Sequence, residues 1–76
     1  MSSIEEQMYI NLGKNVRKYR LAKGLSQEKL SEIIDAGDKF VGHVERFERY
    51  VGLKKLNKIA QALDVELRDL FDFREL

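Results

Sequence analysis

The chain has 76 residues and a net charge of +1, which leaves room for one small domain with one core. Because cysteine is absent and His43 is the single histidine, disulfides, thiolate metal sites and a zinc site are excluded. No apolar run approaches the roughly 20 residues of a membrane span, and residues 1–6 lack the basic and apolar segments of a signal peptide, so we expect one cytoplasmic domain over residues 1–76 without metal, cofactor or membrane contact.

The composition favours helices. Proline is absent, runs of β-branched residues are missing and helix formers dominate, so we predict an all-α fold, a compact bundle of about five helices. The first predicted helix spans about residues 5–22 and ends at Gly24, which is placed as a left-handed cap before Leu25 enters the core. Its inward residues recur at helical spacing and are Met8, Leu12, Val16 and Tyr19.

Two short helices follow. The second predicted helix begins after Ser26, whose hydroxyl can accept from a free backbone N–H, and covers about residues 27–34. Leu30 and either Ile33 or Ile34 face inward, and residues 35–37 form a tight turn. The third predicted helix covers about residues 38–46, with three candidate core residues: Phe40, Val41 and Val44.

The remaining chain predicts two more helices. The fourth covers about residues 53–63 and carries one apolar stripe, made of Leu53, Leu56, Ile59, Ala60 and Leu63. A short fifth helix lies near residues 66–71. Of these elements the second and third are the most informative, because two short helices that cross steeply can place the later one in the major groove of DNA.

Positive charge is concentrated in the middle of the chain. Residues 14–58 hold twelve basic and six acidic side chains, a net charge of +6, whereas residues 1–13 contribute −2 and residues 59–76 contribute −3. A basic body with acidic ends suits an anionic partner bound by the middle, and a solvated helical surface is the alternative.

A set of residues at fixed spacing runs from Leu12 to Phe71. In chain order it comprises Leu12-Gly13-Lys14, Val16-Arg17, Arg20, Lys23-Gly24-Leu25-Ser26-Gln27-Glu28, Leu30, Phe40-Val41-Gly42, Val44-Glu45-Arg46, Glu48-Arg49, Leu53, Leu56, Lys58-Ile59-Ala60, Ala62-Leu63 and Leu70-Phe71. No single piece is diagnostic, but the whole set resembles the Cro-type, phage-repressor-like helix-turn-helix family, also called the xenobiotic-response-element (XRE) type. The part from Phe40 to Val51 is also similar to the small controller proteins of restriction-modification systems.

The resemblance implies a sequence-specific, DNA-binding transcriptional regulator. Its helix-turn-helix covers about residues 26–46, after an N-terminal arm of residues 1–11, and the third helix reads base edges. The outward, base-reading positions that it implies are Asp38, Lys39, Gly42 and His43. The candidate phosphate contacts are Gln27, Arg17, Arg46, Arg49, Lys54 and Lys55. Arg20 either contacts DNA or pairs with Glu45 as a structural ion.

One unit of this kind reads only a few base pairs, so we expect a homodimer on two-fold symmetric double-stranded DNA, with half-sites roughly 34 Å apart. Leu67, Leu70 and Phe71 supply apolar groups for a dimer interface, or else pack onto the protein's own helices. The alternative function is a protein-interaction module, antitoxin-like or adaptor. An enzyme is not expected, because the sequence shows no Ser/His/Asp set, phosphate-binding Gly loop or metal cluster.

Three positions depart from the residues usual in this family. Asp35 stands where Gly is common, and Asp is among the few residues that tolerate a left-handed backbone. Gly37 stands where Ser or Thr often caps the third helix, so Gly37 or Asp38 would be the cap. Phe47 also replaces a Gly. If its backbone is left-handed, Phe47 costs about 1 kcal/mol; otherwise the third helix runs longer.

Overall fold

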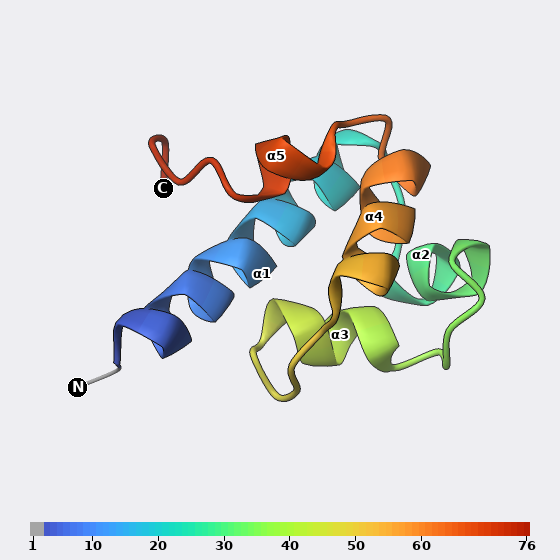
Figure 1. The fold of residues 1–76 in the computed structure, drawn as a ribbon. Helices are drawn as coiled ribbons and strands as arrows, with labels where there is room; N and C mark the ends of the chain where they lie inside the picture. The colour runs from blue at the N-terminus through green and yellow to red at the C-terminus, as the bar shows by residue number, and fades with distance from the viewer. Residues whose placement is uncertain (1–2) are drawn as a thin grey trace.

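Five α-helices and their connections make up residues 3–76, the part of the chain that the computed structural model describes. The helices are α1 (Ile4–Ala22), α2 (Gln27–Ile33), α3 (Phe40–Glu45), α4 (Leu53–Ala62) and α5 (Leu67–Leu70). In Figure 1, α1 runs diagonally across the molecule with α5 above it, α4 to its right and α3 below. α3 packs against α1 and α2, and α5 packs against α1 and α4. The predicted all-α bundle is confirmed.

One apolar core fills the space between the helices. Its buried members are Leu12, Val16, Leu30, Ile34, Phe40, Val41, Val44, Val51, Leu56, Ile59, Ala60, Leu63 and Leu70. The predicted inward stripe is wrong at Leu53, whose surface is 66% exposed. Leu53 is the first residue of α4, and its side chain tilts toward the start of the helix, beyond the core. Of the two open alternatives in α2, Ile34 is buried and Ile33 is exposed.

The first four helices end in the same hydrogen-bonded cap. At each end a backbone N–H donates to the carbonyl five residues earlier, and the pairs are Leu25 to Arg20, Ala36 to Ser31, Glu48 to His43 and Val65 to Ala60. The residue before each of these donors has a positive φ, and these residues are Gly24, Asp35, Phe47 and Asp64. This pattern is the Schellman motif. It confirms the predicted left-handed cap at Gly24 and the left-handed turn at Asp35.

Phe47 is the unusual member of this set. Its φ of 51° costs about 1–2 kcal/mol, because Phe has neither the freedom of Gly nor the short polar side chain of Asp. Its ring stacks on Tyr9, with centroids 5.5 Å apart and planes 10° apart, and Tyr50 lies edge-on to both rings. Each such pair contributes about 0.5–1.5 kcal/mol, so this aromatic cluster of Tyr9, Phe47 and Tyr50 offsets the strain.

α3 is shorter than predicted, because residues 38 and 39 form a turn rather than its first residues. The N-cap residue is Lys39, which has no side-chain acceptor and makes no capping hydrogen bond, so the predicted cap at Gly37 or Asp38 is wrong. The cap that ends α2 turns the chain at Asp35, and residues 36–39 are then needed to bring Phe40 onto the core. The other helices begin and end within one or two residues of the predicted positions.

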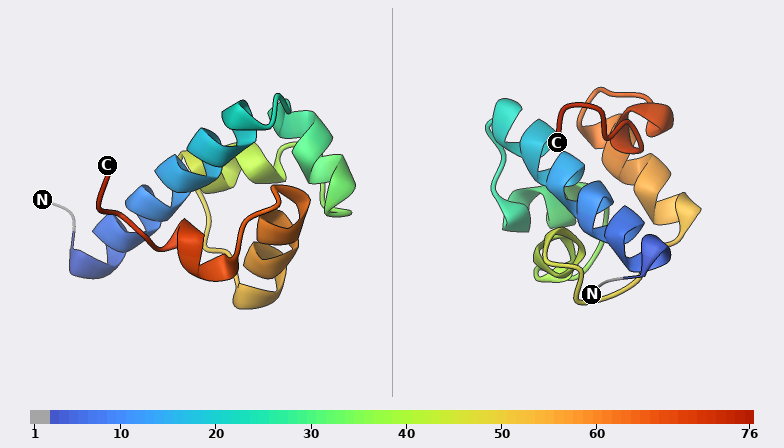
Figure 2. Two further views of the ribbon diagram at one scale, coloured as in Figure 1. Left: turned by 90° about the horizontal axis from the view of Figure 1, so that it is seen from above. Right: turned by 90° about the vertical axis from the view of Figure 1, so that its left-hand side faces the viewer.

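The two ends of the described chain are attached to α1. Within the predicted N-terminal arm, residues 4–11 are the first turns of α1, in line with the helix predicted from about residue 5, and residues 1–2 lie outside the described part. The C-terminal segment runs back beside α1, as both views of Figure 2 show. Asn15 holds it by donating to the carbonyls of Leu70 and Asp72, both at 2.9 Å. The Arg74 side chain hydrogen-bonds the Asp72 carboxylate and lowers its pKa to about 2.

Candidate nucleic-acid interface

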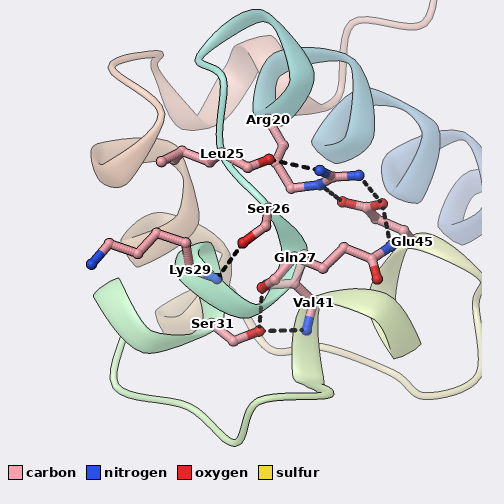
Figure 3. A network of polar contacts seen from close by, with 8 residues as sticks. All are labelled: Arg20, Leu25, Ser26, Gln27, Lys29, Ser31, Val41 and Glu45. Carbon is pink, nitrogen blue, oxygen red and sulfur yellow. Dashed lines mark hydrogen bonds and ion pairs between the residues drawn. The ribbon is translucent and has the colours of Figure 1, made fainter.

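A buried ion pair joins α1 to α3. Arg20 Nε lies 2.6 Å from Glu45 Oε2, and Arg20 Nη2 donates to Glu45 Oε1 at 3.1 Å, which makes the pair bidentate. The two side chains are 8% and 2% exposed. Arg20 also donates to the Leu25 carbonyl at 2.7 Å (Figure 3). Of the two roles left open for Arg20, the structure shows the ion pair with Glu45.

The same ion pair fixes Gln27, the first residue of α2. Gln27 Nε2 donates to Glu45 Oε1 at 3.0 Å (Figure 3). Its amide oxygen lies over Gly42, only 3.0 Å from the place where a Cβ on that glycine would sit, and Arg46 Nη1 lies 3.2 Å from the same place. Gly42 is therefore buried under two side chains, and its lack of a side chain makes room for both of them.

The other three predicted base-reading residues are accessible. Asp38 and Lys39 are exposed in the turn that leads into α3. The His43 side chain is 39% exposed, and its Nε2 lies 4.0 Å from a carboxylate oxygen of Glu48. Lys39 and His43 are four residues apart, so they are neighbours along the same side of the helix.

Cations from the α3–α4 loop and from α4 lie beside this helix. Arg46 Nε donates to Glu48 Oε1 at 2.9 Å. The guanidinium carbon of Arg49 lies 5.0 Å from the centre of the Phe40 ring, and Lys55 Nζ lies 5.8 Å from it, so both are within cation–π range. The structure thus places Gln27 and Arg46 over Gly42, and it places Arg49 and Lys55 within range of the same ring, that of Phe40. The two remaining predicted phosphate contacts, Arg17 on α1 and Lys54 in α4, are exposed and lie outside these contacts.

Comparison with known proteins decides the family. The family model described as helix-turn-helix matches residues 16–70, more than half of the chain. This protein belongs to the helix-turn-helix family. Within that family, control protein C.BamHI of Bacillus amyloliquefaciens is 42% identical over 62 residues, which are 80% of this chain and 76% of that protein.

Solved structures agree with this assignment. The crystal structure of the restriction-modification controller protein C.AhdI from Aeromonas hydrophila matches with a TM-score of 0.80 and 44% identity, over 83% of this chain and 96% of that one. SinR, a master regulator for biofilm formation solved in complex with DNA, matches with a TM-score of 0.75 and 27% identity, over 80% of this chain and 98% of that one. The resemblance to helix-turn-helix regulators, including restriction-modification controllers, is confirmed, and these relatives are regulators rather than enzymes.

Sequence reasoning missed one residue that connects the two helices of the helix-turn-helix. Ser31 is fully buried; its Oγ donates to the Gln27 carbonyl at 2.9 Å and accepts from the Val41 N–H at 3.1 Å (Figure 3). Val41 is in the first turn of α3, where backbone N–H groups have no partner within the helix. The available signal was the spacing, because Ser31 follows Gln27 by one turn and lies between the inward Leu30 and Ile34.

We expect Ser31→Ala to lower the free energy of unfolding by about 1–3 kcal/mol, because the Val41 N–H would be buried without an acceptor. Urea denaturation followed by circular dichroism measures the change. Ser26→Ala is the matched control, since it removes an exposed N-cap bond to the Lys29 N–H and costs about 1 kcal/mol. A smaller loss for Ser31→Ala than for Ser26→Ala would contradict the role given to the buried hydroxyl.

The residues predicted for a dimer interface are placed in two ways. Leu70 is 0% exposed and belongs to the core of the protomer, whereas Leu67 and Phe71 are half-buried and pack at its edge.

Membrane-spanning helices and metal clusters are both absent from the described residues 3–76. None of their helices is long and apolar enough to cross a membrane, and no three of their His, Asp or Glu side chains gather as a metal ion would require.

Proposed function

We propose that this protein is a transcriptional regulator that binds a specific DNA operator by inserting α3 into the major groove. The observation that carries the proposal is the two-sided character of the start of α3. Phe40, Val41 and Val44 bury its inner side, while Lys39 and His43 remain accessible on its outer side. SinR, a relative with the same fold, was solved in complex with DNA, which supports DNA as the partner.

The side chains divide into readers and anchors. Lys39 can donate to O6 or N7 of guanine, His43 can donate to a purine acceptor, and Asp38 can accept from N4 of cytosine. The anchors hold phosphates and carry no sequence information themselves; they are Arg17, Gln27, Arg46, Arg49, Lys54 and Lys55. Gln27 keeps one amide N–H for a phosphate while the other donates to Glu45.

We propose further that the protein binds as a homodimer on a two-fold symmetric operator. An apolar groove between α1, the start of α4 and the residue that follows α5 supports this proposal, and Met8, Leu53 and Phe71 are among the residues that line it. Leu67 and Phe71 would contact the second copy from α5 and its end, and Leu70 would support them from the core below. Ile4, which is 93% exposed, extends the apolar surface along α1.

The names of the two controllers suggest a biological setting. C.BamHI is a control protein, and C.AhdI is a restriction-modification controller. We propose that this protein likewise controls the genes of a restriction-modification system, from the cytoplasm of a bacterium, where its operator lies.

Selection of bound sequences from a random duplex pool, repeated at two salt concentrations, tests the proposal. We expect a two-fold symmetric site, and an affinity whose logarithm falls against the logarithm of salt by about 0.9 for each phosphate contact. Recovery of a single, unsymmetric half-site would contradict the homodimer. No enrichment at either salt concentration would contradict operator binding and favour the protein-interaction module.

The division into readers and anchors has its own test. Lys39→Ala and His43→Ala should each relax the base preference at one position of the operator, at a cost of about 1–3 kcal/mol for each good base contact. Lys54→Ala and Lys55→Ala should each weaken binding to every duplex alike. Each should also reduce the slope of the logarithm of affinity against the logarithm of salt by about 0.9, the value for one phosphate contact. Fluorescence anisotropy with the operator and its single-base variants measures both effects. The division is wrong if the two pairs of variants behave in the same way.

A further inference from the structure

The α3–α4 loop, residues 46–52, carries two of the candidate phosphate anchors. Arg46 begins it and Arg49 lies in its middle. Val51, which is 7% exposed, returns the chain to the core just before α4. Phe47 stands between the two arginines in the sequence, and its ring belongs to the aromatic cluster with Tyr9 and Tyr50. Tyr9 belongs to α1, so the cluster attaches the loop to a helix outside the helix-turn-helix.

The ring of Phe47 is not needed to end α3. A glycine would adopt the same left-handed backbone without strain and would form the same cap, because the cap uses backbone groups alone. In the caps of α1, α2 and α4, the residue that follows the left-handed residue is apolar and partly buried. The corresponding residue after α3, Glu48, is exposed. The stacked ring takes the place of that missing apolar contact.

We propose that Phe47, stacked on Tyr9, is a positioning residue that holds Arg46 and Arg49 in place for phosphate binding. This inference rests on the proposed function. A loop that is ordered before DNA arrives loses less conformational entropy on binding than a mobile one, so its arginines bind phosphate more tightly. The neighbouring contacts fit this role, since Arg46 is bonded to Glu48 and Arg49 lies over the Phe40 ring.

The experiment compares wild-type protein with Phe47→Gly on the operator duplex obtained by selection. We expect Phe47→Gly to remain folded, with a thermal midpoint close to that of the wild type, and to bind about tenfold more weakly. In the free protein we expect faster amide hydrogen exchange over residues 46–50, while residues 53–62 keep their protection. Phe47→Tyr should restore both affinity and protection, because it restores the stacked ring.

Two further variants keep the outcome unambiguous. Tyr9→Leu removes the partner ring without touching the cap, and it should weaken binding and loosen the loop as Phe47→Gly does. Asp64→Gly makes the matched exchange at the left-handed position after α4, away from the arginines, and should bind within about twofold of the wild type. Specific wild-type binding with an unchanged Phe47→Gly affinity overturns this inference alone. Failure of the wild-type protein to bind any duplex overturns the proposed function, and this inference with it.

Discussion

Glu45→Ala is expected to lower the free energy of unfolding by about 3–5 kcal/mol. The substitution leaves the Arg20 guanidinium buried, with the Leu25 carbonyl as its remaining protein partner. It also removes the acceptor that holds the Gln27 amide. Small domains have only about 5–15 kcal/mol of total stability, so the substitution would remove a large share of it. Urea denaturation followed by circular dichroism gives the free energy directly.

A double variant separates an unpaired buried charge from lost packing. Arg20→Met combined with Glu45→Leu replaces both ions by apolar side chains of similar length, and replacements of this kind are often neutral or stabilising. We therefore expect the double variant to be more stable than Glu45→Ala, although its Gln27 amide is no longer held. If the double variant loses as much stability as Glu45→Ala or more, the uncompensated charge is not the cause.

Gly13→Ala is expected to cost about 3 kcal/mol, the upper end for an overpacked core. A Cβ on Gly13 would lie 2.6 Å from the Val44 carbonyl oxygen and 2.9 Å from that of Glu45. Both atoms belong to the backbone of α3 and cannot rotate away, so α1 and α3 would have to separate. The shift would also strain the Arg20–Glu45 ion pair, which joins the same two helices. Thermal and urea unfolding measure the loss.

Gly37→Ala is the matched control for Gly13→Ala. No atom lies within 4 Å of a Cβ built on Gly37, and its φ is not positive. We expect this variant to be as stable as the wild type or up to about 1 kcal/mol more stable, because alanine reduces the entropy of the unfolded chain. If Gly13→Ala is as stable as Gly37→Ala, the close contact between α1 and α3 does not limit the fold.

The sequence predicted the features that depend on neighbouring residues. The five helices apart from the start of α3, the N-cap at Ser26 and the left-handed caps at Gly24 and Asp35 each depend on a short stretch of chain, and the structure confirms them. The contacts of Ser31 and of Gly13 were not predicted. Both contacts depend on how closely two helices approach. The spacing of Ser31 indicates that it lies on the inner side of α2, but it does not identify the Val41 N–H of α3 as its partner.

For the candidate interface, the structure shows where the predicted residues lie, and their roles in DNA binding stay predictions. The family pattern predicted Asp38, Lys39 and His43 as accessible residues, and all three are accessible, although Asp38 and Lys39 lie in the turn before α3. Gly42 was expected to face outward, but the side chains of Gln27 and Arg46 cover it. Side chains that fold back over a glycine come from different elements, so their position requires the packed structure. The cost of a left-handed Phe47 could be stated in advance, whereas its stacking on Tyr9 could not.

The attachment of the C-terminal segment to Asn15 has a consequence for synthesis of the protein. Leu70 is a fully buried member of the core, and the two carbonyls bound by Asn15 belong to residues 70 and 72. A ribosome adds about 5–20 residues per second, so α1 emerges about 2–10 s before these partners do, whereas α4 precedes them by at most about 2 s. During that interval the apolar face of α1 is incompletely covered in the nascent chain. The helix α1, against which α3 packs, therefore acquires its full set of contacts only when nearly all of the described chain has left the ribosome.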